Sequence, residues 1–122
     1  ESKGERQIRL FLEDNDIKYV YQKKFKNCKS TNLLPFDFYL PEYNMCIEYD
    51  GEQHFKPFRF EKDDLKLKKR MNNDDIKNNF CENNNINLYR IKYNDDIYDK
   101  LNKLIKMIKN EYKTLIYNKK EK

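Results

Sequence analysis

Hydrophobic residues recur at helical spacing near both ends of the chain. At the beginning, Ser2 followed three positions later by Glu5 forms a capping-box pattern, which predicts a helix that starts there and extends to about Asp14. The apolar positions of this helix are Ile8, Phe11 and Leu12. Near the other end, one apolar stripe predicts a long helix over about residues 96–117. Its members are Leu101, Leu104, Ile105, Ile108, Tyr112, Leu115 and Ile116.

Shorter segments between these helices have the β-branched and aromatic content of strands. They are residues 18–25, 35–40, 45–50 and 86–93. The turn residues 41–44 join the second and third segments, which predicts an antiparallel hairpin. A charged stretch of about residues 63–83 precedes the fourth strand, and its pattern favours a helix. We expect its inward positions to include Leu67, Met71, Ile76 and Phe80. The order helix, three strands, helix, strand, helix predicts an α/β fold with a mixed central sheet flanked by helices.

The composition is typical of one globular domain that spans residues 1–122. Hydrophobic residues make up 38% of the chain, charged residues 39% and aromatic residues 15%, which is sufficient for one core. The net charge of +5 suits a polyanionic partner, although an ordinary basic protein has the same balance. No segment approaches the ~20 apolar residues of a membrane span, and none resembles a signal peptide. We therefore expect no membrane partner.

Three cysteines indicate the redox environment. Cys28, Cys46 and Cys81 form no CxxC motif and no Cys/His pair, so they predict neither a disulfide framework nor a zinc site. We therefore expect an intracellular protein in a reducing compartment. The sequence does not distinguish the cytoplasm from the nucleus.

Carboxylates gather on the predicted hairpin. Because side chains alternate along a strand, we expect Phe36 and Phe38 to face a core while Asp37 faces the other way. In the next strand, Glu48 and Asp50 share one face, and direct pairing of the hairpin would bring Asp37 beside them. Oxygen ligands of this kind suit Mg²⁺ or Mn²⁺, and such an ion supports phosphodiester hydrolysis. The alternative is a solvated sheet face paired with lysines.

Three stretches carry a resemblance to a known family. They are residues 34–41 (LPFDFYLP), 47–55 (IEYDGEQHF) and 73–81 (NDDIKNNFC). With them, residues 2–93 resemble the PD-(D/E)XK nuclease superfamily, in the branch of very short patch repair (Vsr-like) endonucleases and phage or giant-virus homing endonucleases. The resemblance implies a restriction-endonuclease-like αβββαβ core, followed here by the C-terminal helix. It also implies Mg²⁺-dependent cleavage of DNA, with Mn²⁺ as a substitute.

The resemblance also implies a metal site. Asp37 and Glu48 would bind the ion, and the main-chain carbonyl of Tyr49 is a further candidate ligand. Glu5, on the leading helix, would act as a ligand of the metal or of water. Its alternative role is structural, because the third residue of a capping box needs no chemistry.

The catalytic base implied by the resemblance is His54, the only histidine in the chain. Near neutral pH, its imidazole could take a proton from the attacking water. Asp74 would orient the ring, and Asp75 is the alternative. A structural role for His54 is the other interpretation.

The chain departs from the family pattern at Asp50, which stands where a lysine is expected two residues after Glu48. Gln53 and His54 are nearby candidates for positioning the water, and Lys77 could supply the displaced ammonium from the following helix. The alternative for Lys77 is an ordinary surface lysine. Asp50 could bind metal or form a salt bridge with a helix lysine, and the sequence leaves both open.

Basic residues flank the acids and could contact phosphates without reading bases. They are Lys23, Lys24, Lys26 and Lys29 before the site, and Lys66, Lys68, Lys69 and Arg70 after it. We expect an endonuclease that nicks or cuts duplex DNA, either as a homodimer or with an appended DNA-recognition domain. Two alternatives stay open. One is an inactive nucleic-acid-binding module of the same fold, and the other is a nuclease that acts on RNA or branched DNA.

Overall fold

The computed structural model describes the backbone of residues 1–52 and 61–121, and the side chains of residues 1–52 and 65–110. The elements follow in the order α1 (Lys3–Asp14), β1 (Val20–Lys29), β2 (Leu33–Leu40), β3 (Met45–Asp50), α2 (Glu61–Asn83), β4 (Asn87–Lys92) and α3 (Ile97–Glu121). This order and the α/β class confirm the prediction. Residues 53–60, which include Gln53 and His54, lie outside the described residues.

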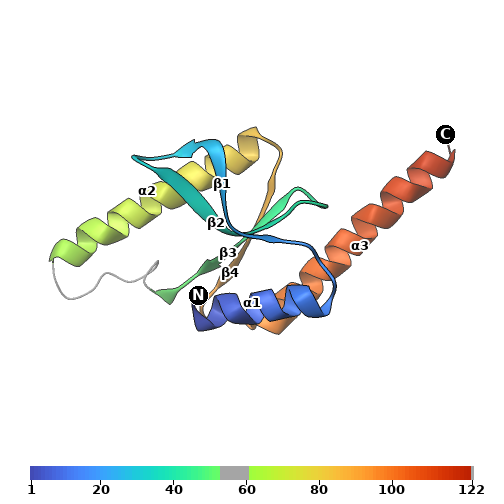
Figure 1. The fold of residues 1–122 in the computed structure, drawn as a ribbon, viewed down its shortest axis with the longest axis horizontal. Helices are drawn as coiled ribbons and strands as arrows, with labels where there is room; N and C mark the ends of the chain where they lie inside the picture. The colour runs from blue at the N-terminus through green and yellow to red at the C-terminus, as the bar shows by residue number, and fades with distance from the viewer. Residues whose placement is uncertain (53–60, 122) are drawn as a thin grey trace.

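The four strands form one mixed sheet in the order β1-β2-β3-β4. The pairs β1–β2 and β2–β3 are antiparallel, whereas β3 and β4 are parallel and their connection includes α2. In Figure 1, α2 lies on the opposite side of the sheet from α1 and α3. The predicted mixed sheet flanked by helices is therefore present, and each face of the sheet has its own core.

The core under α1 and α3 contains members of both predicted helical stripes, although Tyr112, Leu115 and Ile116 lie outside the residues whose side chains the structure describes. Ile8 and Leu12 of α1 are buried, as are Leu101, Leu104 and Ile108 of α3. Burial of such a side chain stabilises the fold by about 1.5–3 kcal/mol. The capping box is also confirmed, since the side chains of Ser2 and Glu5 each accept a hydrogen bond from the other's backbone N–H.

The core under α2 contains the three cysteines. Cys28, Cys46 and Cys81 are all buried there and all are free thiols. Of the expected inward positions of α2, Ile76 and Phe80 pack against this core. Met71 does not, because its side chain is 55% exposed, so that expectation was wrong. Leu67 is half-buried.

The alternation of faces breaks between Phe36 and Phe38. In the core under α1 and α3, the ring centroids of Phe38 and Tyr21 lie 5.4 Å apart. Phe36 instead lies in the core under α2, where its ring centroid is 5.6 Å from that of Phe25. The expectation that both phenylalanines share one face was therefore wrong. The paired strand β1 has a left-handed residue at this level, Gln22, with φ of 57°. Such a residue changes which face the following side chains occupy.

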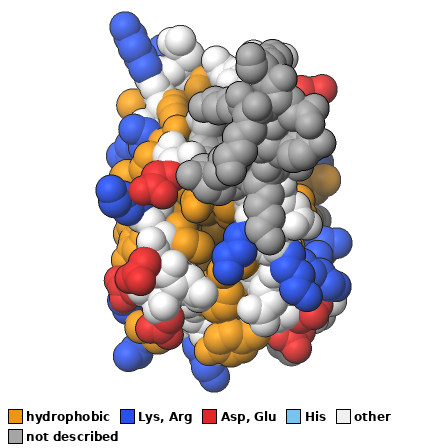
Figure 2. Space-filling model, turned by 90° about the vertical axis from the view of Figure 1, so that its right-hand side faces the viewer, with side chains coloured by type: hydrophobic (Ala, Val, Ile, Leu, Met, Phe, Trp, Pro, Cys, Tyr) orange, Lys and Arg blue, Asp and Glu red, His pale blue; other side chains and the backbone are white. Residues whose placement is uncertain are grey.

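Some hydrophobic side chains remain at the surface. Figure 2 shows one face of the molecule, where hydrophobic side chains are visible among charged ones. The large exposed ones include Leu10, Leu65, Tyr98 and Met107. Within the described residues, no helix has the length and apolar character that a membrane span requires.

Candidate active site

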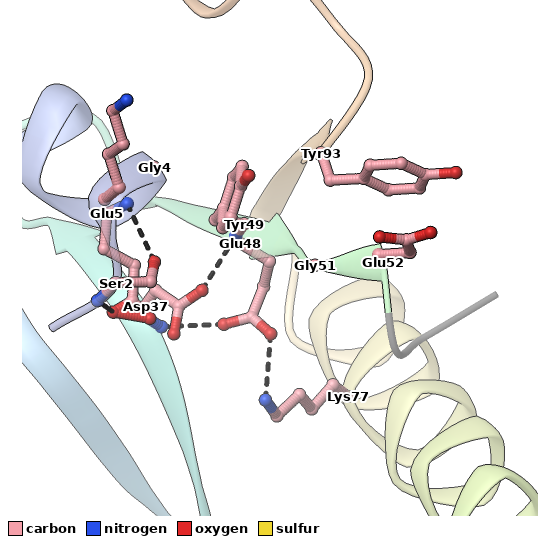
Figure 3. Close-up of a pocket in the computed structure, with 11 residues that line it drawn as sticks. Ser2, Gly4, Glu5, Asp37, Glu48, Tyr49, Gly51, Glu52, Lys77 and Tyr93 are labelled. Carbon is pink, nitrogen blue, oxygen red and sulfur yellow. Dashed lines mark hydrogen bonds and ion pairs between the residues drawn. The ribbon is translucent and has the colours of Figure 1, made fainter. Parts of the chain in front are cut away.

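A cavity of about 520 Å³ opens beside the end of β3. Its walls come from the beginning of α1, from β2 and β3, from α2 and from the residue that follows β4 (Figure 3). The lining residues are Ser2, Lys3, Gly4, Glu5, Asp37, Glu48, Tyr49, Gly51, Glu52, Lys77 and Tyr93. Five of the predicted site residues therefore meet in one cavity, namely Glu5, Asp37, Glu48, Tyr49 and Lys77.

Asp37 and Glu48 are held by reciprocal hydrogen bonds. Glu48 Oε1 accepts a bond from the backbone N–H of Asp37 at 2.7 Å, and Asp37 Oδ2 accepts one from the backbone N–H of Tyr49 at 2.7 Å. The regular pairing of β2 with β3 runs only from Leu40 to Phe38 on β2. Beyond Phe38, carboxylate oxygens of Asp37 and Glu48 thus accept the hydrogen bonds that backbone carbonyls accept in regular strand pairing. These bonds hold both carboxylates in position.

The environment of Asp37 disfavours the ionised form of its carboxyl group, because the Glu48 carboxylate is adjacent. Burial and the adjacent Glu48 carboxylate raise the pKa of Asp37 to about 7. Glu48 itself is 3% exposed. Two adjacent carboxylates with so little exposure to water favour either a shared proton or a cation between them.

The ammonium of Lys77 reaches into the same site from α2. Its Nζ lies 2.9 Å from Glu48 Oε2, and the Lys77 side chain is only 12% exposed. It also lies 5.4 Å from the centre of the Phe36 ring, which places it in a cation–π contact. The interpretation of Lys77 as an ordinary surface lysine was therefore wrong. Lys77 supplies an ammonium beside Glu48, although the lysine expected in β3 is replaced by Asp50.

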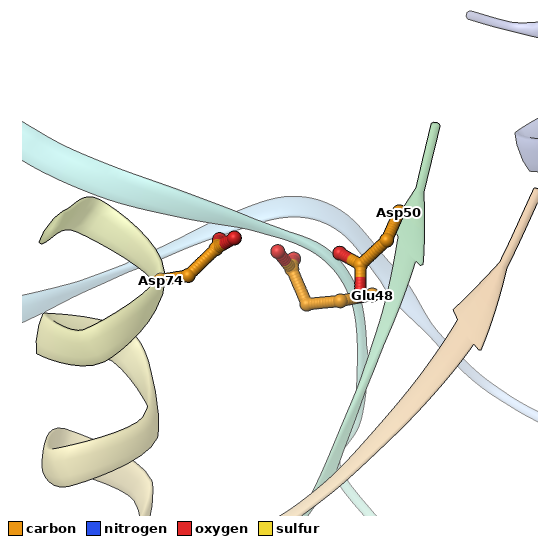
Figure 4. A group of neighbouring side chains, drawn as sticks. All are labelled: Glu48, Asp50 and Asp74. Atoms are coloured by element: carbon orange, nitrogen blue, oxygen red, sulfur yellow. The ribbon is translucent and has the colours of Figure 1, made fainter. Parts of the chain in front are cut away.

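A second group of acids lies deeper under α2. Carboxylate oxygens of Glu48, Asp50 and Asp74 come within 4.8 Å of one another (Figure 4), and such a group could hold a metal ion. Arg90 of β4 contacts two of them, with Nη1 at 2.8 Å from Asp50 and Nη2 at 3.6 Å from Asp74. Of the two roles left open for Asp50, a salt bridge is present, but its partner is a strand arginine instead of a helix lysine.

Two arrangements of carboxylates could therefore bind a cation, and they share Glu48. Asp37 and Glu48 line the open cavity, whereas Asp50, Asp74 and Arg90 do not. The Asp37 side is therefore the one that opens into the cavity. The backbone N–H of Tyr49 points toward Asp37. Because the N–H and C=O of one strand residue point to the same side, the Tyr49 carbonyl faces Asp37 as well.

Glu5 has the capping role considered for it, and its role as a ligand of metal or water stays a prediction. Its carboxylate accepts the capping bond from Ser2, and its Oε2 also accepts a hydrogen bond from the hydroxyl of Tyr21 at 3.0 Å. The same side chain lines the cavity that contains Asp37. The cap therefore holds a carboxylate at the rim of the site without preventing it from acting there.

Gly4 and Arg90 are site residues that sequence reasoning missed. A Cβ at Gly4 would lie 2.3 Å from Cζ of Tyr49, so only glycine allows α1 to approach the ring this closely. Its signal was the rarity of glycine, since the chain has only two. Arg90 had no local signal, because its acidic partners lie far away in the sequence.

Most of the predicted phosphate contacts are exposed on β1 and α2. On β1, Lys24, Lys26 and Lys29 are exposed, whereas Lys23 is half-buried over the rings of Phe25 and Tyr39. On α2, three lysines are exposed, and the adjacent arginine is half-buried. These residues are Lys66, Lys68, Lys69 and Arg70. The predicted alternative orienter, Asp75, is exposed and is not in the acidic group.

Comparisons of the chain with protein-family models, with curated proteins and with solved structures found no match. The resemblance to PD-(D/E)XK nucleases therefore rests on the three sequence stretches quoted above.

Proposed function

We propose that this protein is a metal-dependent endonuclease of the PD-(D/E)XK type that hydrolyses DNA phosphodiester bonds. The observation that carries the proposal is the open cavity in which the interlocked carboxylates of Asp37 and Glu48 lie beside the ammonium of Lys77. An acid pair, a cation and access for a large substrate are the groups that phosphoryl chemistry requires.

The donor set fits Mg²⁺ or Mn²⁺. Asp37, Glu48 and the Tyr49 carbonyl offer only oxygen atoms, which is the preference of these hard cations. Burial and the neighbouring acid raise the pKa of Asp37 to about 7, so a divalent cation between the two carboxylates would favour their ionised forms. When bound, the ion would polarise a phosphoryl oxygen and lower the pKa of a coordinated water.

The protein side chains would divide the remaining work. Lys77, held by Glu48, would orient the attacking water and stabilise negative charge that develops on the phosphate. Glu5 would hydrogen-bond water at the rim of the cavity, while Gly4 allows α1 to bring it there. His54 and Gln53, outside the described residues, remain the proposed base and its neighbour. Asp74 remains the candidate that would orient His54.

The substrate is proposed to be duplex DNA. The exposed lysines of β1 and α2 can neutralise backbone phosphates without selecting a sequence. Cleavage of both strands would require a homodimer or two successive nicks, and sequence selection would require an appended recognition domain. RNA or branched DNA is the alternative substrate.

The test is cleavage of supercoiled plasmid in Mg²⁺, in Mn²⁺ and in EDTA. The protein should nick the plasmid only with metal, and Asp37→Asn and Glu48→Gln should reduce the rate by at least about 100-fold. Both amides keep an acceptor for the backbone N–H groups, whereas Glu48→Gln also leaves Lys77 without its carboxylate, so circular dichroism would check that each variant is folded. Glu82→Gln on the exposed end of α2 is the matched control and should cleave normally.

Substrate competition refines the result. Labelled duplex, single-stranded, branched DNA and RNA would be compared in the same buffer. If no nucleic acid is cut while binding persists, the inactive binding module becomes the better account. If the two amide variants cut as fast as the parent, the assigned acid pair is wrong.

A further inference from the structure

A second cavity of about 390 Å³ lies next to the proposed active site. Both cavities are lined by Lys3, Gly4, Tyr49 and Tyr93, so they adjoin each other at the beginning of α1. In Figure 3, the rings of Tyr49 and Tyr93 lie on the side of the first cavity away from Lys77. A strand whose phosphate occupied the acid pair would therefore have these rings beside the adjoining nucleotide.

Three tyrosines give the second cavity its character. Tyr49 and Tyr93 are half-buried, and Tyr98 in the first turn of α3 is 55% exposed. Exposed aromatic rings leave apolar faces in water, and they are the groups on which nucleobases stack in single-strand-binding proteins. The Tyr49 ring packs closely against Gly4, which limits movement of that wall.

The polar groups of the cavity suit a base better than a phosphate. Gln7 contributes an amide with donors and an acceptor, and Asp95 contributes a carboxylate. Asp95 is positioned by the backbone N–H of Lys92, from which its Oδ2 accepts a bond at 2.8 Å. A carboxylate repels a phosphate but can accept a hydrogen bond from a base N–H. The one lysine of the cavity, Lys3, lies on the boundary with the acid site, where the backbone would pass.

We propose that this cavity is a nucleobase-binding subsite that takes a base adjacent to the cleaved phosphate, stacked against Tyr98 and its neighbouring tyrosines. The inference rests on the proposed function, because the acid site defines where the backbone lies. The size of the cavity is in the range of small-molecule binding sites. A base enters it only when it is out of a duplex stack, as in single-stranded DNA or after it has been flipped out of a duplex.

The test measures binding without cleavage, so that it does not depend on catalysis. Glu48→Gln protein in EDTA would be titrated against a fluorescein-labelled single-stranded oligonucleotide, with anisotropy as the readout. Adding Tyr98→Ala should weaken binding roughly 5- to 150-fold, the usual range for losing one stacked base. Tyr98→Phe keeps the ring and should retain affinity. Met107→Ala, on the same helix with 48% exposure and outside the cavity, is the matched control and should also bind normally.

Abasic oligonucleotides identify the stacked base. In a series of oligonucleotides, each carries one abasic nucleotide at a different position. At one position, Tyr98→Ala should no longer weaken binding, because the base that Tyr98 contacts is already absent. An equal loss at every abasic position would place Tyr98 on the backbone and overturn the inference. So would unchanged binding by Tyr98→Ala, or no binding of single strands at all.

The two proposals fail separately. If the parent protein cleaves nothing but shows the base-dependent effect of Tyr98, the nuclease function is wrong and the subsite stands. If the parent cleaves with metal but Tyr98→Ala binds as tightly as the parent, the subsite is wrong and the nuclease stands.

Discussion

Asp37 and Glu48 are joined through the backbone of the strands that carry them. The Glu48 carboxylate accepts the Asp37 N–H, and the Asp37 carboxylate accepts the N–H that follows Glu48, both at 2.7 Å. The two acids therefore have a structural role in closing the rim of the sheet and a proposed chemical role in the cavity. A substitution that removes the acceptor oxygen, such as alanine, would affect both roles at once. The amide variants Asp37→Asn and Glu48→Gln keep the acceptor oxygen and remove the negative charge, so they test the chemical role.

The stability of the metal-free protein should fall as pH rises from about 4 to about 7. Burial and Glu48 raise the pKa of folded Asp37 to about 7 from 3.8. In this window the folded state keeps a proton that the unfolded chain releases, so stability decreases with pH, by at most about 1.4 kcal/mol per pH unit for one proton. Urea unfolding in EDTA at pH 5 and pH 8 would measure the effect. Asp37→Asn should show a smaller decrease, and an identical decrease in both proteins would contradict the assignment.

Removal of the Lys77 ammonium should destabilise the fold and slow cleavage. Lys77→Met leaves the buried Glu48 carboxylate without its cation, and loss of one partner of a buried ion pair costs about 3 kcal/mol. The cleavage rate should fall about 100-fold or more. Lys77→Arg should recover part of both. Urea unfolding and plasmid nicking would be measured for these variants and for the control Lys106→Met, at an exposed position of α3. The control should change stability by less than about 0.5 kcal/mol.

A methyl group at position 4 should destabilise the fold by displacing the Tyr49 ring or α1 next to the cavity. In Gly4→Ala the new Cβ would lie 2.3 Å from Tyr49, so the ring or α1 must move. We expect a loss of about 1–3 kcal/mol, although alanine alone would favour the helix by about 1 kcal/mol. Adding Tyr49→Ala to Gly4→Ala should then cost less than Tyr49→Ala costs in the parent. Additive losses in this double-mutant cycle would show that the contact is not limiting.

Loss of Arg90 should make the protein more dependent on divalent cations. Arg90 lies between Asp50 and Asp74, whose oxygens cluster with those of Glu48. Arg90→Met should lower the melting temperature in EDTA, because the acids lose a shared cation. Mg²⁺ or Mn²⁺ should raise the melting temperature of the variant more than that of the parent. Equal shifts in the two proteins would mean that the group of Glu48, Asp50 and Asp74 does not bind the metal.

The sequence by itself determined the elements of the fold and several members of the site. Helical stripes, the capping box and strand composition depend on residues within one or two turns, so they could be recognised without the structure. The same local patterns placed Asp37 and Glu48 on paired strands, and the family resemblance gave Lys77 and Asp74 as helix candidates. Their chemical roles stay predictions.

Only the tertiary structure decided the features that depend on distant contacts. The salt bridge between Asp50 and Arg90 depends on the parallel register of β3 with β4. The left-handed Gln22 accompanies the transfer of Phe36 to the core under α2, which strict alternation does not predict. The need for Gly4 appears only when α1 packs against Tyr49. In each case the cause lies in how separate elements pack, and that arrangement depends on the whole chain, whereas periodicity reports only on neighbouring residues.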